Sequence, residues 1–473
     1  MDFIQQQFID PVSHFLWSYL LIWVLLGAGF WFTFRTRFVQ FRMFGRMIGL
    51  LRGSREGAGD GVSSFQAFCI GLASRVGTGN IAGVAIALTL GGPGAIFWMW
   101  CVALIGMATA LVEATLAQLY KVPDEDGSFR GGPAYYIQRG LGSRGGGVLF
   151  AVLLIFAFGI AFEMVQANTI TDVIRDDRVS EKALAVILIV LTAPILFGGV
   201  KRIARVAELV LPVMALAYVA VAAVILVTNL GQVPAVIGDI VGSAFGLGSA
   251  AAGITVGVAA ALLNGVKRGL FSNEAGMGSA PNAAATATTA HPVNQGLIQS
   301  LGVFVDTMVI CTATAVIILL APSSIYDPGV TTSAQGASLT QAAVSAQLGD
   351  WSAYLMTVLV TVFAYSSVLG NYTYAEINMT FLGAGRRVMT AFRLVVLMSI
   401  GLGALVALDS VWAIADVAMA LMALVNLTAI LLLGRWAFAA LTDFEDALGR
   451  GETPRFTASG NDHLPAPLTT DAW

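Results

Sequence analysis

The chain has 473 residues, of which 57% are hydrophobic and only 11% are charged, with a formal net charge of -3. This composition excludes an ordinary soluble domain and is typical of a protein with several membrane-spanning helices. The charges form no basic stripe, so the composition also argues against a nucleic-acid-binding protein.

Apolar stretches follow one another along the chain, each close to the ~20 residues that a helix needs to cross a bilayer. They cover residues 15–34, 64–90, 95–120, 147–170, 183–199, 204–228, 254–287, 296–320, 351–372, 388–408 and 411–433. The sequence therefore predicts an all-α polytopic membrane protein with about eleven transmembrane helices. Residues 1–11 contain no Lys or Arg, so we expect no cleaved signal peptide and one extra N-terminal helix.

Positive charge gathers in alternate loops, which predicts the orientation in the membrane. Arginines crowd residues 35–55, and further basic residues lie in 121–144, 201–205 and 386–393, whereas 91–94 has none and 322–350 carries only acidic charge. By the positive-inside rule the N-terminus lies outside and the C-terminus is cytoplasmic. We expect a multi-pass protein of a bacterial or archaeal plasma membrane.

The stretch Gly77-Thr78-Gly79-Asn80 interrupts the second apolar segment. Each glycine costs a helix roughly 1 kcal/mol relative to alanine. Main-chain groups freed at membrane depth persist only where protein or a water-filled cavity satisfies them. Many secondary transporters build their substrate site from such a broken helix. We therefore expect a transporter, with this break as half of its binding site.

A second interruption, residues 269–278, breaks the seventh apolar segment in the same way, and a basic residue precedes each break: Arg75 and Arg268. Five helices start with each break, and the loop charges give the two broken helices opposite directions. This predicts a five-plus-five inverted repeat with substrate between the broken helices, although glycines can also serve close helix packing. The expected divisions are 1–61 (N-terminal helix and basic loop), 62–230 (first repeat), 231–253 (outer connection with a short helix), 254–434 (second repeat) and 435–473 (cytoplasmic tail, loosely ordered from 442).

Two long motifs carry a resemblance to a known family. They are Ala73 to Ala85, followed by Gly91-Gly92-Pro93-Gly94-Ala95-Ile96-Phe97-Trp98-Met99-Trp100, and Lys267-Arg268-Gly269-Leu270-Phe271-Ser272-Asn273-Glu274-Ala275-Gly276. The first resembles the signature of the alanine or glycine:cation symporter family, and the second is similar to that family's other hallmark. The resemblance extends to about residue 433. It implies the five-plus-five fold of the leucine-transporter type, coupling to sodium, and a small neutral amino acid as substrate.

An amino-acid zwitterion needs an anion site and a cation site close together. The helix that resumes after the first break presents unpaired amides and a positive dipole end, which suit the carboxylate. We assign the amides of Thr78 and Gly79 to it, with the side chain of Asn80. Carbonyls of Phe271 and Ser272 are candidates for the ammonium group, and Phe271 is also a candidate lid, with core packing as the alternative. Further candidate substrate contacts are Gln166, Met277 and Asn371.

Sodium prefers oxygen ligands, which carbonyls and hydroxyls supply. By analogy with the leucine-transporter fold, one sodium lies between the first broken helix and the eighth core helix. The carbonyls of Ala73 and Val76 and the hydroxyls of Ser366 and Ser367 fit that pattern, although such serines often bond their own backbone. A second sodium would use Asn80, Asp306 or Thr307. No cofactor is expected beyond sodium as the coupling ion.

Ionisable residues in apolar stretches are expensive and are functional hypotheses by default. Here they are Arg75, Glu113, Glu163, Glu208, Lys267, Arg268, Glu274, Asp306 and Asp416. Helix-end snorkelling or structural pairing is the favoured interpretation for Glu113, Glu208 and Asp416. Arg75 and Glu274 adjoin the two breaks, so they are candidates for an ion pair that joins the repeats, or for a proton-responsive group.

One position departs from the family pattern. Where the family has tryptophan followed by Tyr-Tyr-Gly-Glu, this chain reads Gly370-Asn371-Tyr372-Thr373-Tyr374-Ala375-Glu376. An amide in place of a large ring enlarges the pocket and adds polarity, which predicts tolerance of a bulkier or amide-bearing substrate such as glutamine.

Three alternatives stay open. Proton coupling on the same fold is the nearest. An intramembrane enzyme is remote, because His14, His291 and His463 lie away from the helix centres, no catalytic motif occurs, and Cys69, Cys101 and Cys311 have no CxxC spacing. A channel would have no need of two occluding breaks.

Overall fold

The computed structural model of the protein describes residues 5–55, 61–124, 127–174, 180–198, 200–247, 257–331, 336–468, 470 and 472–473. Within these residues the named elements are helices, apart from an antiparallel pair of short strands, β1 (Val122–Pro123) and β2 (Phe129–Arg130). Seven of the described helices are long and apolar enough to span a membrane, or eight if one bent pair counts as a span. The prediction of an all-α polytopic membrane protein is confirmed. The count of about eleven spans and the inverted repeat stay predictions.

The first span is longer than predicted. It is a 31-residue helix, Gln5–Arg35, built from η1 (Gln5–Ile9), α2 (Asp10–Phe15), η2 (Leu16–Leu21) and α3 (Ile22–Arg35). The sequence-based start at residue 15 came too late because Asp10 and His14 lower the local hydropathy. Two short helices, α4 (Val39–Arg42) and α5 (Phe44–Arg52), then carry the arginine-rich loop.

The first half of the core begins with a helix in two parts. Ser63 and Gln66 form a reciprocal capping box that starts the first part. The elements are α6 (Ser64–Arg75), η3 (Gly79–Gly83), α7 (Val84–Gly91), α8 (Gly94–Leu119), α9 (Pro133–Gly140), α10 (Arg144–Phe156), η4 (Ala157–Ala161), α11 (Phe162–Val173), α12 (Glu181–Leu196) and α13 (Val200–Thr228). The short helix predicted in the outer connection is present as α14 (Val233–Ala244), while 248–253 lie outside the described residues.

The second half also begins with two helical pieces. Its elements are α15 (Val258–Asn273), α16 (Ala280–Thr286), α17 (Pro292–Val303), η5 (Phe304–Cys311), α18 (Thr312–Leu319), α19 (Gly336–Leu348), α20 (Trp351–Phe381), α21 (Arg386–Gly403) and α22 (Leu408–Gly449). Helix α19 was not predicted, because its many small and polar residues resemble a loop. Residues 254–256 of the seventh predicted segment lie outside the described residues.

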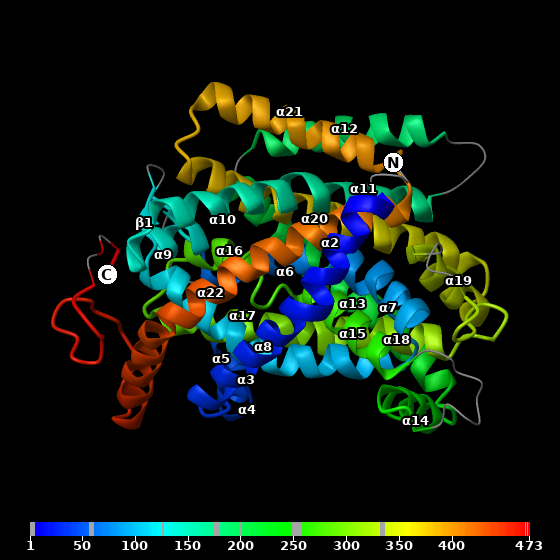
Figure 1. Ribbon diagram of the computed structural model, residues 1–473, viewed down its shortest axis with the longest axis horizontal. Helices are drawn as coiled ribbons and strands as arrows, with labels where there is room; N and C mark the ends of the chain where they lie inside the picture. Colours follow the sequence, from blue (N-terminus) through cyan, green and yellow to red (C-terminus); the bar gives the residue numbers. More distant parts are fainter. Residues whose placement is uncertain are drawn as a thin grey trace.

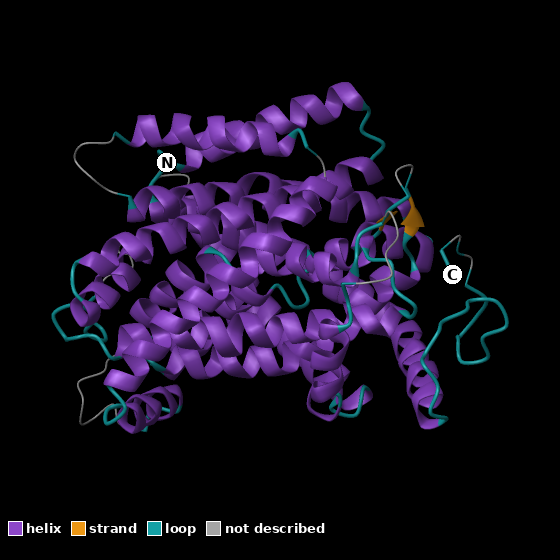
Figure 2. Ribbon diagram, turned by 180° about the vertical axis from the view of Figure 1, so that it is seen from behind, coloured by secondary structure: helices purple, strands orange, loops and turns teal. Residues whose placement is uncertain are grey.

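The loops gather at the two ends of the helix bundle, with short loop segments inside it (Figure 2). β1, α9 and the C-terminus lie at one end, and α14 and α19 lie at the other (Figure 1). The ion pair of Arg42 with Glu445 places the basic loop after the first span at the end where α22 finishes. The hydroxyl of Tyr326 donates to the Leu88 carbonyl, so the predicted outer loop 322–350 lies against the end of α7, next to the predicted outer loop 91–94. Which end faces the cytoplasm stays a prediction.

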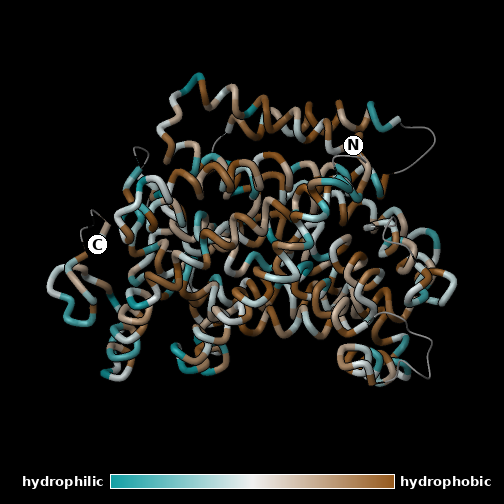
Figure 3. The backbone as a smooth tube through the Cα atoms, viewed as in Figure 1, coloured by the Kyte–Doolittle hydropathy of each residue, from teal (hydrophilic) through white to brown (hydrophobic). Residues whose placement is uncertain are grey.

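Apolar residues dominate the bundle (Figure 3). Helix α8 packs against α15 and α17, and α11 packs against α20 and α21. Large apolar side chains also point outward: Leu209, Val213 and Leu216 of α13 are 67–73% exposed. An aqueous surface would disfavour such a stripe, whereas lipid accommodates it.

The prediction of a loosely ordered tail from residue 442 is wrong for the described residues. Helix α22 runs for 42 residues to Gly449, because the acidic residues after 442 end the apolar stretch but not the helix. Beyond it, the Phe456 amide donates to the Ala290 carbonyl at 3.0 Å. The indole of Trp473 donates to the Gln118 carbonyl at 2.8 Å. The tail is therefore bound to the end of the bundle.

Candidate functional site

The first predicted break is present. Helix α6 ends at Arg75, the chain resumes at Gly79, and the two pieces are bent by 48°. The Gly77 amide bonds the side-chain oxygen of Asn80 at 2.9 Å, and the Thr78 amide lies 3.4 Å from the Gln166 oxygen. The side chains of Asn80 and Gln166 thus reach main-chain amides that an unbroken helix would satisfy itself.

Two glycines of this break are required by close packing. A Cβ atom added at Gly77 would lie 2.0 Å from the Ser367 hydroxyl, which leaves no room for it. At Gly79 it would lie 3.0 Å from the Phe271 ring and 3.1 Å from the Ser272 Cα. The glycines therefore allow the break to approach α20 on one side and α15 on the other.

The second predicted break is also present. Helix α15 ends at Asn273, α16 begins at Ala280, and the loop between them contains Glu274, Gly276 and Gly278 at positive φ. The Gly276 amide donates to Glu113 of α8 at 3.2 Å. Asn426 of α22 donates to both Glu113 and the Gly276 carbonyl, each at 2.9 Å. Glu113 thus pairs with the loop, in line with the structural interpretation favoured for it.

The two breaks meet. The contacts at Gly79 place the start of η3 against the last turn of α15, where Phe271 and Ser272 lie. The helix that begins here presents amides and a positive dipole end, and the helix that ends here presents carbonyls and a negative one. These opposed ends at one place match the two charges of a zwitterion.

A carboxylate joins both breaks to the helix after the second one. Asp306, in the π-helical turn η5, is fully buried. It accepts hydrogen bonds from Asn80 at 2.7 Å, Ser272 at 2.7 Å and Thr307 at 2.8 Å. Cys311 is buried and contacts the side chains of Asn80 and Ser272. The three residues predicted for a second sodium, Asn80, Asp306 and Thr307, therefore lie together.

The residues predicted for the first sodium lie together only in part. The Ser367 hydroxyl donates to the Ala73 carbonyl at 2.8 Å, and Val76 is the C-cap residue that follows α6. The Ser366 hydroxyl instead donates to the Phe363 carbonyl of its own helix. This is the alternative role of adjacent serines in membrane helices.

Three aromatic rings stack beside the breaks. The Phe271 ring lies 4.5 Å from that of Phe162 and 4.4 Å from that of Trp412, between centroids. Trp412 also lies within ordinary contact distance of a Cβ at Gly83. Sequence reasoning found Phe271 but missed Phe162 and Trp412, because a lone ring in an apolar stretch looks like any core residue.

A separate polar group lies beside the first break. Ser74 lies 2.7 Å from both Glu274 and Asn371, and Ser279 donates to Glu274 at 2.7 Å. The hydrogen bond found for Asn371 therefore joins it to Ser74 rather than to Asn80 or Asp306. Met277 is buried in the second break, where its amide donates to the Glu274 carbonyl at 3.1 Å.

The ion pair considered for Arg75 and Glu274 is not among the salt bridges of the described residues. Arg75 instead donates to the Gln299 carbonyl of α17 at 3.3 Å. Glu274 joins the two broken helices through Ser74 and Ser279, both uncharged.

Other predicted intramembrane charges are paired. Asp416 accepts from Arg268 at 2.7 and 2.8 Å, and from Lys267 at 2.6 Å. The Arg268 guanidinium also lies over the Trp412 ring. Glu208 accepts from Gln66 at 3.0 Å. These contacts fit structural pairing of Asp416 and Glu208, as favoured from the sequence.

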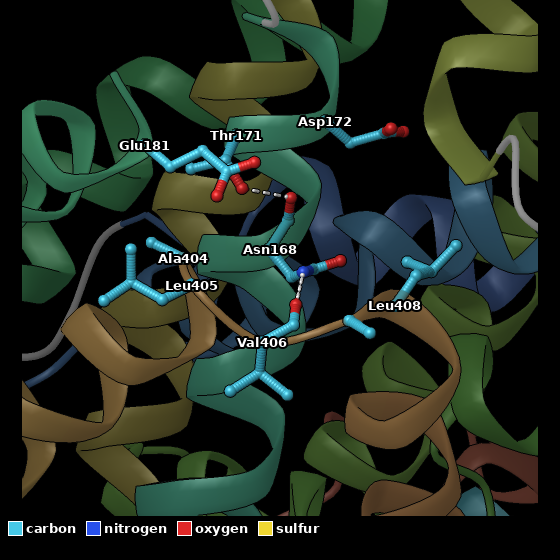
Figure 4. Close-up of a pocket in the computed structure, with 9 residues that line it drawn as sticks. Asn168, Thr171, Asp172, Glu181, Ala404, Leu405, Val406 and Leu408 are labelled. Carbon is cyan, nitrogen blue, oxygen red and sulfur yellow. Dashed lines mark hydrogen bonds between the residues drawn. The ribbon is translucent and has the colours of Figure 1, made fainter. Parts of the chain in front are cut away.

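A cavity of about 280 Å³ opens at the end of α11 (Figure 4). Asn168 and Thr171 line one side, and the segment 404–408 lines the other. The Asn168 amide donates to the Val406 carbonyl at 2.7 Å. A second cavity of about 440 Å³ lies at the opposite end of the bundle, lined in part by Ser64, Thr288 and Asn294. The breaks thus lie between two cavities.

Comparison with known proteins gives one consistent group. The sequence model of the "Sodium:alanine symporter family" matches residues 1–458. The chain is 48% identical over 458 residues to a protein of Bacillus subtilis named "Probable sodium/glutamine symporter GlnT", covering 96% of this chain and 94% of that one. It is 46% identical to the amino-acid carrier protein AlsT of the same organism, covering 98% and 97%. It is 39% identical to the sodium/alanine symporter AgcS of Methanococcus maripaludis, covering 92% and 95%.

Proposed function

The chain belongs to the sodium:alanine symporter family, and from that premise we propose that it couples sodium entry to uptake of a small neutral amino acid. The family and the named relatives are transporters, which confirms the predicted class of membrane carrier and excludes an enzyme. The choice of sodium rather than protons, and of the amino acid, belongs to the proposal.

The observation that carries the proposal is the meeting of the two breaks. The substrate carboxylate would bind the amides of Thr78 and Gly79, where Gln166 now reaches the Thr78 amide at only 3.4 Å. The ammonium group would bind carbonyls at the end of α15, those of Phe271 and Ser272. Since opposite helix-dipole ends face the two substrate charges, each charge gains a partner without a buried counter-ion.

Sodium has two candidate places beside this site. One is bounded by the Ala73 and Val76 carbonyls and the Ser367 hydroxyl. The other is the Asp306 carboxylate with Asn80 and Thr307. A fully buried carboxylate is costly without positive charge beside it, and three neutral donors and the more distant Arg75 guanidinium compensate it only in part. A sodium ion at Asp306 would supply that charge and use hard oxygen ligands. Of the two candidate sodium sites, we therefore favour the one at Asp306.

The substrate range that we propose runs from alanine to glutamine. A relative named as an alanine symporter and one named as a glutamine symporter both align over most of the chain. Asn371 holds an amide beside Ser74, and its own side-chain nitrogen is buried without a described partner. The side-chain carbonyl of an amide-bearing substrate could accept from that nitrogen, whereas the methyl side chain of alanine could not. Alanine strongly outcompeting glutamine, with Asn371→Trp changing nothing, would count against this range.

Alternating access follows from the position of the breaks between the two cavities. We propose that the broken helices and the surrounding helices move relative to one another, so that the site opens to one cavity at a time. The predicted orientation makes the cavity at Asn168 the outer one and the cavity at Ser64 the cytoplasmic one.

The experiment is counterflow of labelled amino acids in proteoliposomes that contain the purified full chain. Vesicles preloaded with unlabelled alanine or glutamine should accumulate the labelled compound only when sodium is present. Replacing sodium by choline should abolish the signal, and a proton gradient alone should not restore it. Sodium-independent counterflow driven by protons would favour the alternative coupling ion, and absence of any amino-acid counterflow would contradict the proposal.

A further inference from the structure

Glu163 is a buried carboxyl group without a hydrogen-bond partner at either oxygen among the described residues. It lies in the first turn of α11, directly after the π-helical turn η4. π-Helical turns inside longer helices are frequent at functional sites. The sequence flagged Glu163 as an intramembrane charge, and the proposed substrate and sodium sites leave it without a role.

The other fully buried acids near the breaks differ from Glu163 in this respect. Glu113 accepts from the Gly276 amide and Asn426, Glu274 accepts from Ser74 and Ser279, and Asp306 accepts from three donors. Each of these carboxylates has polar groups that stabilise negative charge. Glu163 has none within the part of the chain that the structure describes, so ionisation there would leave an unpaired charge at membrane depth. Such a charge costs several kcal/mol or more, and the neutral, protonated group avoids that cost.

Charged groups on the neighbouring elements have other partners or lie at the helix ends. On α20 and α21, Glu376 and Tyr372 both bond Arg393. On α22, Asp416 bonds Arg268, and on α11 itself Asp172 bonds the Ser338 amide at the start of α19. The remaining titratable groups on elements packed against α11 include Tyr374, whose ring contacts Phe158, and Glu181, which is exposed. No described salt bridge includes Glu163.

Contacts made by two neighbours of Glu163 in the sequence place it near the substrate site. The preceding residue, Phe162, stacks on Phe271 of the second break. Gln166, three residues later, reaches the Thr78 amide of the first break. Because residues three apart share a face of a helix, Glu163 lies about one turn from Gln166 along the helix wall beside the site. In the predicted orientation this turn is on the cytoplasmic side of Gln166.

We propose that Glu163 is a proton-binding site of the transport cycle. The carboxyl group is protonated while the helices pack around it. When the carrier opens to the cytoplasm and water reaches α11, the O–H bond breaks heterolytically, the proton passes to water, and the carboxylate remains. The carboxylate takes up a proton again from the outer side before the helices close. A proton therefore accompanies the amino acid and sodium, and this role rests on the proposed function.

The test uses the purified full chain in proteoliposomes with an internal pH-sensitive dye and the membrane potential clamped. Sodium-driven uptake of alanine or glutamine by the wild-type protein should acidify the interior. Glu163→Gln keeps a neutral side chain, so uptake should persist while acidification is lost. Wild-type uptake at alkaline internal and external pH should fall about tenfold per pH unit beyond the midpoint, whereas the Gln variant should show a flat profile.

Controls separate the possible outcomes. Glu452→Gln makes the same chemical change at an exposed tail position and should retain wild-type acidification. If Glu163→Gln does not assemble, Glu163→Asp keeps the acid at a different depth and should shift the pH midpoint, and an unchanged midpoint would overturn the proposal. Wild-type uptake without acidification, or acidification by a transport-competent Gln variant, would overturn it as well. Absence of sodium-driven uptake by the wild type would instead contradict the proposed function itself.

Discussion

Gly77→Ala should weaken sodium-dependent substrate binding without unfolding the protein. The new Cβ atom would lie 2.0 Å from the Ser367 hydroxyl, and 3.0 Å from the Ser367 Cβ. To reach an ordinary contact of about 3.4 Å, the hydroxyl would have to retreat by about 1.4 Å, which breaks its 2.8 Å bond to the Ala73 carbonyl. Overpacking of this kind costs about 1–3 kcal/mol. If that cost falls on the sodium-bound state, sodium affinity drops by about five- to 150-fold.

The assay is binding of labelled alanine or glutamine to purified protein over a sodium titration. Gly83→Ala is the matched control, because its Cβ would lie 3.6 Å from Trp412, an ordinary contact distance, on the same broken helix. The half-saturating sodium concentration should rise at least about fivefold for Gly77→Ala and stay within about twofold for the control. Wild-type sodium dependence in a folded Gly77→Ala protein would refute the assignment of Ser367 and Ala73 to sodium.

Three further changes test other parts of the site and fold. Asp306→Asn removes the charge at the candidate second sodium site. Since hydrogen bonds to charged groups contribute about 1.5–3 kcal/mol, the half-saturating sodium concentration should rise by about tenfold or more. An unchanged sodium titration would show that sodium does not bind at Asp306. Phe271→Ala removes the contacts of this ring with Phe162 and Trp412. Because each aromatic contact contributes about 0.5–1.5 kcal/mol, substrate affinity should fall by about fivefold or more. Equal affinity of the variant and the wild type in competition binding would show that the ring serves only core packing. His291 is buried, and its ring nitrogen accepts a hydrogen bond from the Val293 amide at the start of α17. Burial lowers the pKa of His291 below 6.5, although Asp443 beside the ring opposes this shift, so its contribution to stability is present above pH 6.5 and is lost as the pH falls below that value. His291→Asn keeps a capping side chain that does not titrate, and melting temperatures at pH 7 and pH 4.5 should differ less for it than for the wild type; equal differences would contradict the neutral buried ring.

The positions of the breaks were predictable from the sequence because glycine leaves a local mark. Gly77 and Gly276 interrupt apolar stretches, and the structure breaks both helices there. Asn80 and Asp306 were placed in one candidate site from the implied fold, and the structure joins them by a hydrogen bond. The residue type alone marked the breaks, and the family pattern suggested which residues lie beside them; the sodium-binding role of Asn80 and Asp306 stays a prediction.

Other features depend on contacts between distant residues, which leave no local mark. Glu113 accepts a hydrogen bond from the Gly276 amide, which lies 163 residues away in the sequence, and the sequence around Glu113 reveals nothing of that partner. Asn371 was interpreted from a change in ring size, but its bond to Ser74 depends on how α20 and α6 pack. Trp412 stacks on Phe271 only because α22 crosses α15 there. The sequence showed that these side chains are acidic, polar or aromatic, but only the packing of the helices determines which residues they contact.

The central claim is that main-chain groups of two broken helices hold the amino acid. The most direct measurement is an experimental structure of the protein with alanine or glutamine and sodium bound. The account predicts substrate density with its carboxylate at the Thr78 and Gly79 amides and its ammonium group at the Phe271 and Ser272 carbonyls. Density confined to the cavity between Asn168 and Val406, with the breaks in direct contact and no ligand between them, would contradict it.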